Sequence, residues 1–127
     1  MRKEFTFIGD LDAYNPDGFV VKLDKDIVGK KSLLDEISVK FSFPNYFGHN
    51  WDALVDCLCD LSWIKQYNIS LIHTMIPCLE KRELLDYIHT LREVMHAWEN
   101  AREPQHQFDV VFPIPAKRFL RTIESVE

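Results

Sequence analysis

Glycine is scarce in this sequence, with 4 residues in 127. Phosphate-binding loops and nucleophile elbows depend on closely spaced glycines, and the sequence contains neither pattern. Its five histidines and three cysteines also lack the spacing of a metal motif. The sequence therefore disfavours an enzyme, and we expect neither a cofactor nor a metal ion.

Long apolar runs and a cysteine framework are absent as well. Cys57, Cys59 and Cys78 make an odd number of thiols, which suits a reducing compartment better than a set of disulfides. The opening MRKEFTFIGDLD lacks the apolar stretch of a signal peptide. No run approaches the roughly 20 apolar residues that span a bilayer. We therefore expect a cytoplasmic protein.

Positive charge is in short supply, because 15 Lys and Arg stand against 20 Asp and Glu, for a net charge of −5. Nucleic acids and anionic membranes attract clusters of Lys and Arg. We therefore expect neither of them as a direct partner, and we favour a basic protein. The length fits a single domain over residues 1–127, and we expect a monomer.

Short β-branched runs alternate with segments of helical periodicity. Residues 4–9 and 19–23 are two such runs, and the turn YNPDG between them predicts a strand pair. Further strands are expected at 67–74 and 108–114, helices at 32–41, 50–61 and 79–100, and an amphipathic tail from residue 116. Ser32 and Asn50 are the expected N-caps of the first two helices. Because parallel strands need long crossovers, this order predicts an α/β fold with a small parallel sheet.

The second predicted helix carries Asp52, Asp56 and Asp60 at a spacing of four residues, opposite its leucines. The plain interpretation is a solvated helix face. Against it, like charges at this spacing destabilise a helix by roughly 0.2–0.5 kcal/mol per pair, and no Lys or Arg alternates with them. The arrangement costs stability, so a cationic surface outside the protein is the simplest explanation for it.

Four aromatic residues flank this helix, namely Tyr46, Phe47, Trp51 and Trp63. Tyr and Trp around charged groups are typical of protein interfaces. For each of the four taken singly, packing in the core is the more common role. We expect some of them to serve the core and the rest to contact a partner.

The stretch FPNYFGHNWDALVDCLCDLSW, residues 43–63, together with the preceding SLLDEI, resembles the signature of the barstar family of ribonuclease inhibitors. The matching positions are Pro44, Tyr46, Phe47, Gly48, Asn50, Trp51, Asp52, Ala53, Leu54 and Asp56. The order of strands and helices agrees with the family over roughly residues 18–114. Residues 1–15 and 116–127 are additions to that pattern.

The resemblance implies a barstar-like α/β fold, with a three-stranded parallel sheet packed by helices and an added N-terminal strand. It also implies an intracellular inhibitor, of the immunity or antitoxin kind, whose acidic helix blocks the active site of a basic ribonuclease or nuclease toxin. Asp52 and Asp56 would face basic groups of that enzyme, with Asp56 central. The implied partner-binding residues are Tyr46, Phe47, Gly48, Asn50, Trp51, Asp52, Val55, Asp56, Trp63 and Glu99.

Some of these positions depart from the family pattern. Val55 stands where the family's type member has a Trp, and Trp63 follows the helix with a spacing that differs by about two residues. Glu99 is the counterpart of an acidic contact on the long helix, and Asp60 has no family role. An alternative function is therefore a non-inhibitory interaction module of the same fold that binds another basic protein.

Other sites remain as alternatives. Asp52, Asp56 and His49 could imitate an acid–base cluster, although no accompanying motif supports catalysis. Cys57 and Cys59 lie two residues apart, on different faces of a helix, so they cannot bind one metal ion together. His49 is expected to make a local hydrogen bond or a rim contact, and His73, in a strand, to be a hydrogen-bonded core or edge residue.

Overall fold

The computed structural model describes residues 3–45 and 47–125 of the chain. These residues form four strands and four helices. In chain order they are β1 (Thr6–Ile8), β2 (Phe19–Leu23), α1 (Lys30–Lys40), α2 (Trp51–Leu58), β3 (Asn68–His73), α3 (Lys81–Glu99), β4 (Gln107–Pro113) and α4 (Ala116–Ser125).

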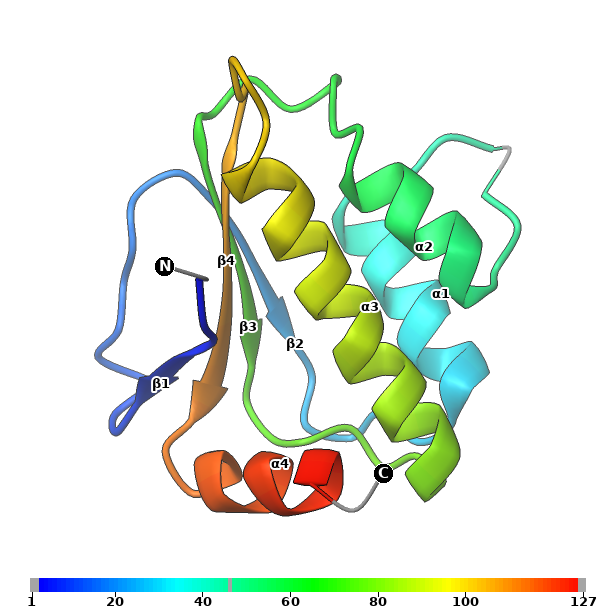
Figure 1. Ribbon diagram of the computed structural model, residues 1–127, viewed down its shortest axis with the longest axis vertical. Coiled ribbons are helices and arrows are strands. Elements are labelled where there is room, and N and C mark those ends of the chain that lie inside the picture. The colour runs from blue at the N-terminus through cyan, green and yellow to red at the C-terminus, as the bar shows by residue number, and fades with distance from the viewer. Residues whose placement is uncertain (1–2, 46, 126–127) are drawn as a thin grey trace.

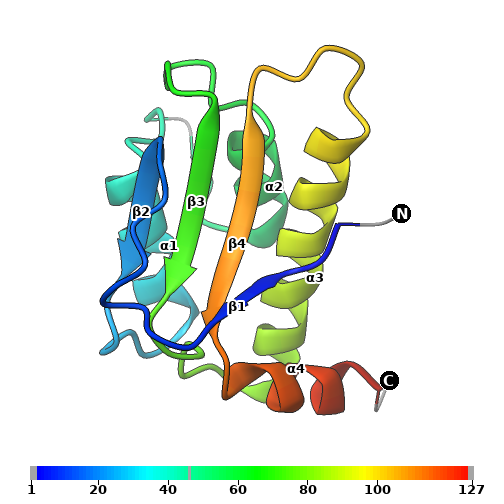
Figure 2. The same cartoon turned by 90° about the vertical axis from the view of Figure 1, so that its left-hand side faces the viewer.

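The four strands form one parallel sheet with the order β1-β4-β3-β2 (Figure 2). β3 pairs with β2 on one side and with β4 on the other, and β1 adds to the outer edge of β4. The predicted α/β class is therefore confirmed, with a three-stranded parallel sheet and an added N-terminal strand.

The predicted pairing of the first two strands is wrong. β1 and β2 occupy opposite edges of the sheet and run in the same direction. The turn residues between them serve a different purpose: Gly18 has a φ of 100°, and a Cβ there would lie 2.1 Å from the backbone oxygen of Asn68. The glycine is required because the chain passes close to the start of β3, not because it forms a hairpin.

Helices α1, α2 and α3 cover one face of the sheet, and residues 9–18 run back across the other face (Figures 1 and 2). Successive strand residues point to opposite faces. The helix side contains the main core, to which Val21, Leu71 and Val110 contribute. On the other side Ile72 is also buried, at 2% exposure. The N-terminal segment thus both extends the sheet and covers part of its second face, where Val20 of β2 remains 40% exposed.

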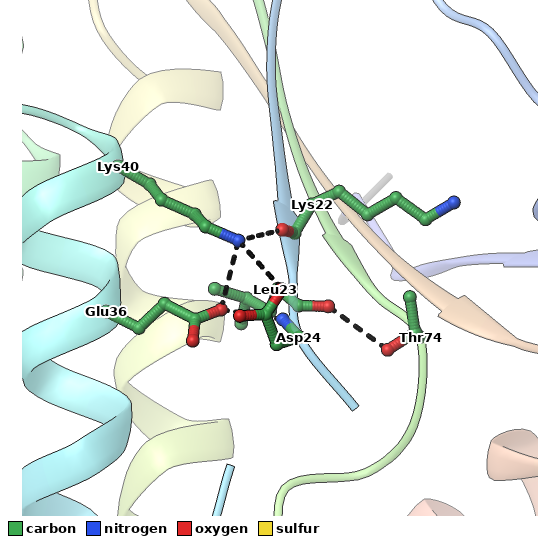
Figure 3. A network of polar contacts seen from close by, with 6 residues as sticks. All are labelled: Lys22, Leu23, Asp24, Glu36, Lys40 and Thr74. Atoms are coloured by element: carbon green, nitrogen blue, oxygen red, sulfur yellow. Dashed lines mark hydrogen bonds and ion pairs between the residues drawn. The ribbon is translucent and has the colours of Figure 1, made fainter. Parts of the chain in front are cut away.

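Helix α1 is attached to the edge strand β2 by the Lys40 ammonium group (Figure 3). It donates to the backbone oxygen of Lys22 at 2.6 Å and lies 3.2 Å from the Glu36 carboxylate and 3.3 Å from that of Asp24. The Thr74 hydroxyl donates to the next carbonyl, that of Leu23. An unpaired strand edge is a template for aggregation, and a lysine at this place both blocks it and fixes α1.

Two predicted helix ends differ from the structure. α1 begins at Lys30, before Ser32, because the backbone N–H of Gly29 bonds to Cys78 and turns the chain into the helix there. α2 ends at Leu58, not near residue 61. Leu61 is fully buried but adopts a positive φ of 46°, so it continues the apolar pattern from outside the helix. Asp60 consequently lies beyond the helix.

The tail predicted from residue 116 is helix α4, which buries Ala116, Leu120 and Ile123. Arg92 of α3 connects it to the rest of the molecule. The Arg92 guanidinium donates two hydrogen bonds of 2.8 Å to the Glu124 carboxylate and one of 3.1 Å to Glu4, just before β1. One side chain therefore joins both terminal segments to the longest helix.

His73 is a core residue with both ring nitrogens hydrogen-bonded, as its position in a strand predicts. Because a carbonyl only accepts, Nδ1 carries the proton and donates to Val111 at 3.0 Å, while Nε2 accepts from the Tyr87 hydroxyl at 2.6 Å. Burial lowers the pKa of His73 from its ordinary value of 6.5 to about 4. The neutral ring is thus part of the packed core.

We predict that this histidine makes stability depend on pH. Between pH 6.5 and about 4 the unfolded chain binds a proton at His73 that the folded protein does not. The free energy of unfolding should therefore fall by roughly 3 kcal/mol as pH drops through that window. Urea titrations at several pH values measure the slope, which His73→Gln should remove. Equal slopes in wild type and His73→Gln would contradict the assignment.

Candidate functional site

Helix α2 forms where the sequence provides both a cap and an apolar stripe. Asn50 has extended backbone angles, and its side-chain oxygen accepts from the Ala53 N–H at 2.7 Å, as predicted for the N-cap. Leu54 and Leu58 are fully buried, as the helical spacing requires. Asp52 lies in the first turn, where a carboxylate complements the helix dipole.

The C-terminal end of α2 is held by side chains from other elements. The Trp98 indole of α3 donates to the Leu58 carbonyl at 2.8 Å. His106, ahead of β4, lies 2.8 Å from both the Leu61 and the Gln66 carbonyl oxygens. The Trp98 bond satisfies a carbonyl group that the helix end leaves unpaired, and the ring N–H of His106 donates to one of the two carbonyls of the following segment. The helix is therefore fixed by α3 and by the approach to β4.

The carboxylates of Asp52, Asp56 and Asp60 are exposed. Within residues 3–45 and 47–125, no Lys or Arg forms an ion pair with any of them. At the start of the helix, the Lys30 ammonium group lies over the Trp51 ring, 5.1 Å from its centre. The acidic face, defined here as Asp52, Asp56 and Asp60, is thus negative and uncompensated.

Asp35 of α1 shows the opposite arrangement. One oxygen of its carboxylate forms an ion pair of 2.7 Å with Lys31, and the other lies 3.1 Å from the Nε2 atom of His49. The hydrogen bond from Lys31 is the main cause that lowers the pKa of Asp35. The chain thus neutralises an aspartate one helix away from the acidic face. His49 also contacts the Phe47 carbonyl at 3.2 Å, which confirms the expected local bond.

Glu93 of α3 is an acidic neighbour that the sequence analysis missed. Burial, followed by the charges of Glu93 and Asp56, raises the pKa of the Cys59 thiol to about 11. Cys59 therefore lies between a carboxylate of α2 and one of α3, and Glu93 extends the acidic face onto α3. Packing of α2 against α3 creates this proximity, and periodicity within either helix alone does not reveal it.

Glu99, the acidic residue of α3 selected from the sequence, makes a different contact. Its carboxylate accepts from the backbone N–H of Lys3 at 3.1 Å. It therefore helps to attach the N-terminal segment to the end of α3. Glu93 is the α3 carboxylate whose charge acts on the Cys59 thiol, together with that of Asp56.

Most of the aromatic side chains around α2 pack in the core or against it. Phe47 is 7% exposed, with its ring centre 4.9 Å from that of Phe43. Trp51 and Trp63 are half-buried against the core, and the Trp63 indole donates to the Phe41 carbonyl at 2.7 Å. Tyr46 lies outside the described residues. Packing thus accounts for most of the surface of the Phe47 side chain and for part of the surface of both tryptophans.

The remaining predicted positions surround the start of α2. Gly48 and Asn50 are exposed, and the Asn50 amide donates back to the Gly48 carbonyl at 3.3 Å. Val55 is half-buried in the middle of α2. The turn and the first half of the helix therefore present polar groups at the surface, and Val55 gives this surface a small aliphatic contact.

Within the part of the chain that the structure describes, there is neither a candidate metal centre nor a membrane-spanning helix. Over the described ranges, no group of three His, Cys, Asp or Glu side chains is placed to hold a metal ion. Cys57 is buried in the core and Cys59 is half-buried, and burial is the main cause that raises the pKa of both thiols. In the same ranges, none of the helices combines the length and apolarity needed to cross a bilayer.

Comparison with known families identifies the fold. A family model described as "Barstar (barnase inhibitor)" matches residues 19–113, which include α1, α2, α3 and strands β2, β3 and β4. The chain belongs to the barstar family. The resemblance seen in the sequence is thereby confirmed. The description of the family names an inhibitor of barnase. Strand β1 and helix α4 lie outside the matched residues, and no curated protein matched the chain.

We predict that the Asn50 cap stabilises the protein independently of charge. Asn50→Ala removes the acceptor for the Ala53 N–H and should lower the free energy of unfolding by about 1 kcal/mol. Asn50→Asp retains a capping oxygen and should stay close to wild type. Urea denaturation followed by circular dichroism measures both variants, and equal losses in the two would show that the cap is not what holds this end of α2.

Proposed function

We propose that this protein is an intracellular inhibitor that occludes the active site of a basic ribonuclease with α2, as the immunity partner of a toxin. The observation that carries the proposal is the uncompensated acidic face on a helix fixed at both ends. Membership of the barstar family supports it. The protein itself would perform no catalysis.

The chemistry of a ribonuclease active site suits such a surface. Phosphate-binding sites consist of Arg, Lys and His side chains, and a carboxylate accepts two parallel hydrogen bonds from an Arg. In our proposal Asp52 and Asp56 occupy the places of RNA phosphates, and Asp56 lies at the centre. Asp60 and Glu93 widen the negative field around them.

Burial in the complex strengthens these contacts. A charge pair separated by about 4 Å contributes about 1 kcal/mol in water but about 4 kcal/mol at an effective dielectric constant of about 20. Desolvation of both groups opposes part of this gain. Because α2 is already fixed before binding, little further ordering of the helix is required, which lowers the entropic cost of association.

The turn before α2 contributes the rest of the proposed interface. Gly48 and Asn50 are exposed, and the exposed part of Trp51 lies beside Asp52. Tyr46 belongs to the interface on the sequence resemblance. Phe47 and Trp63 act mainly through packing, because Phe47 is buried and the Trp63 indole is bonded to α1.

Val55 favours a second function. A half-buried valine in the middle of α2 offers less contact area than the aromatic residue of the family pattern. A protein that retains the acidic face but not this contact could bind another basic protein without inhibiting a nuclease. Such an interaction module is the alternative to our proposal.

Substitution of Asp56 tests the inhibitory mechanism. Barnase and a panel of other basic ribonucleases are titrated with wild type, Asp56→Ala and Asp17→Ala, an exposed aspartate of the β1–β2 connection that alters net charge equally. Loss of a central charged contact should weaken inhibition by more than about 2 kcal/mol, with little change in stability. Asp17→Ala should inhibit like wild type.

The outcomes of this titration are distinct. Equal inhibition by wild type and Asp56→Ala would remove Asp56 from the mechanism. Absence of inhibition across the panel, with binding to a basic protein retained, would favour the interaction module. Cleavage of RNA by the purified protein alone would refute a purely inhibitory role.

Salt should act on association more than on dissociation. At about 0.15 M ionic strength charges are screened beyond about 8 Å, so the long-range attraction between the acidic face and a basic enzyme weakens as salt rises. Stopped-flow mixing at increasing sodium chloride should show a steep fall in the association rate and a smaller change in the dissociation rate. An association rate that does not respond to salt would indicate apolar docking instead.

A further inference from the structure

A cavity of about 480 Å³ lies between β1, α3 and α4, away from the acidic face. In Figure 1, α3 separates β1 from α2. The walls of the cavity are formed by residues of the N-terminal segment, by Arg92 of α3, and by four residues of α4. The lining residues are Glu4, Phe5, Phe7, Arg92, Lys117, Leu120, Arg121 and Glu124. A volume of this size is typical of sites for small ligands.

The cavity contains more positive than negative charge, although the protein as a whole is acidic. Arg92 is already paired with Glu124 and Glu4, which accounts for both carboxylates of the lining. Lys117 and Arg121 are exposed and have no carboxylate partner among the described residues. They are four residues apart on α4, a spacing at which like charges destabilise a helix.

The floor of the cavity is aromatic. Phe7 is half-buried, and its ring stacks on that of Phe112 with the ring centres 6.3 Å apart. The Lys117 ammonium group lies 5.8 Å from the centre of the Phe7 ring. Phe5 is covered by the Arg92 guanidinium at 4.3 Å, so Phe7 offers the accessible aromatic surface. A flat ring placed on Phe7 would therefore take the place of the exposed Lys117 ammonium over the ring face and keep that cation at its edge.

We propose that this cavity binds a heteroaromatic monophosphate of the nucleotide type. Its ring packs on Phe7, and its phosphate accepts hydrogen bonds from Lys117 and Arg121. The second oxygen of Glu4, which is not used by Arg92, can accept from an amino group on the ring. Each feature of the cavity then has a complementary group on the ligand: aromatic surface, two cations and one acceptor.

The site is a property of this chain and does not depend on inhibition. β1 and α4, which supply most of the lining, lie outside the residues matched by the family model. The acidic face repels a phosphate, whereas the cavity attracts one. Binding here and binding of a ribonuclease at α2 would therefore be separate events with opposite electrostatics.

Titration of the full-length, isotope-labelled protein with adenosine 5′-monophosphate tests the proposal. Amide NMR shifts should change in β1 and α4 and not in α2. Adenosine, which lacks the phosphate, and inorganic phosphate, which lacks the ring, should each bind at least about tenfold more weakly, because each removes one set of contacts.

Two variants of α4 provide the matched comparison. The double variant Lys117→Ala/Arg121→Ala should weaken binding by about tenfold or more, whereas Arg118→Ala, an exposed cation of the same helix outside the cavity lining, should not. All the substituted side chains are exposed, so thermal melts should show that each variant folds. Shifts that are absent at millimolar ligand, or weakened equally by Arg118→Ala and the double variant, would overturn the proposal.

Discussion

The hydrogen bonds that fix the two ends of α2 are the constraint on which the rest of the site depends. A short helix with repelling carboxylates gains little from its own sequence, since isolated helices of this length are marginal in water. Asn50 stabilises the first turn, and Trp98 and His106 bind carbonyl groups at and after the last one. Because these side chains hold the backbone of α2 at both ends, its exposed side can carry charges that would otherwise oppose folding.

The distribution of ion pairs shows that the acidic face is not a consequence of too few cations. Lys31 neutralises Asp35, which His49 also contacts, and Lys40 lies between Asp24 and Glu36. These pairs serve the fold, because they join α1 to β2 and to the turn before α2. The same turn leads directly into residues that have no such partners. Positive charge thus helps to position the acidic face, and no Lys or Arg of residues 3–45 and 47–125 forms an ion pair with it.

The sequence was sufficient where short-range chemistry decides the structure, and insufficient where packing between distant segments decides it. Asn50 as a cap and the burial of Leu54 and Leu58 follow from local spacing. The edge position of β1 does not, because its pairing with β4 joins residues about a hundred positions apart in the chain. Glu93 was missed for the same reason, since only the contact between α2 and α3 brings its charge close enough to act on Cys59.

The two terminal segments modify the protein without reaching the acidic face. β1 continues the sheet beyond β4, and α4 packs against α3 and β4, so both additions lie on the side of α3 that faces away from α2. Arg92 holds them together, and its pairing with Glu124 and Glu4 raises the pKa of an already permanent cation. Because α3 also provides Trp98 and Glu93, the same helix supports the acidic face on one side and the cavity on the other. A single helix therefore allows a second binding surface to be added while the geometry of the first is preserved.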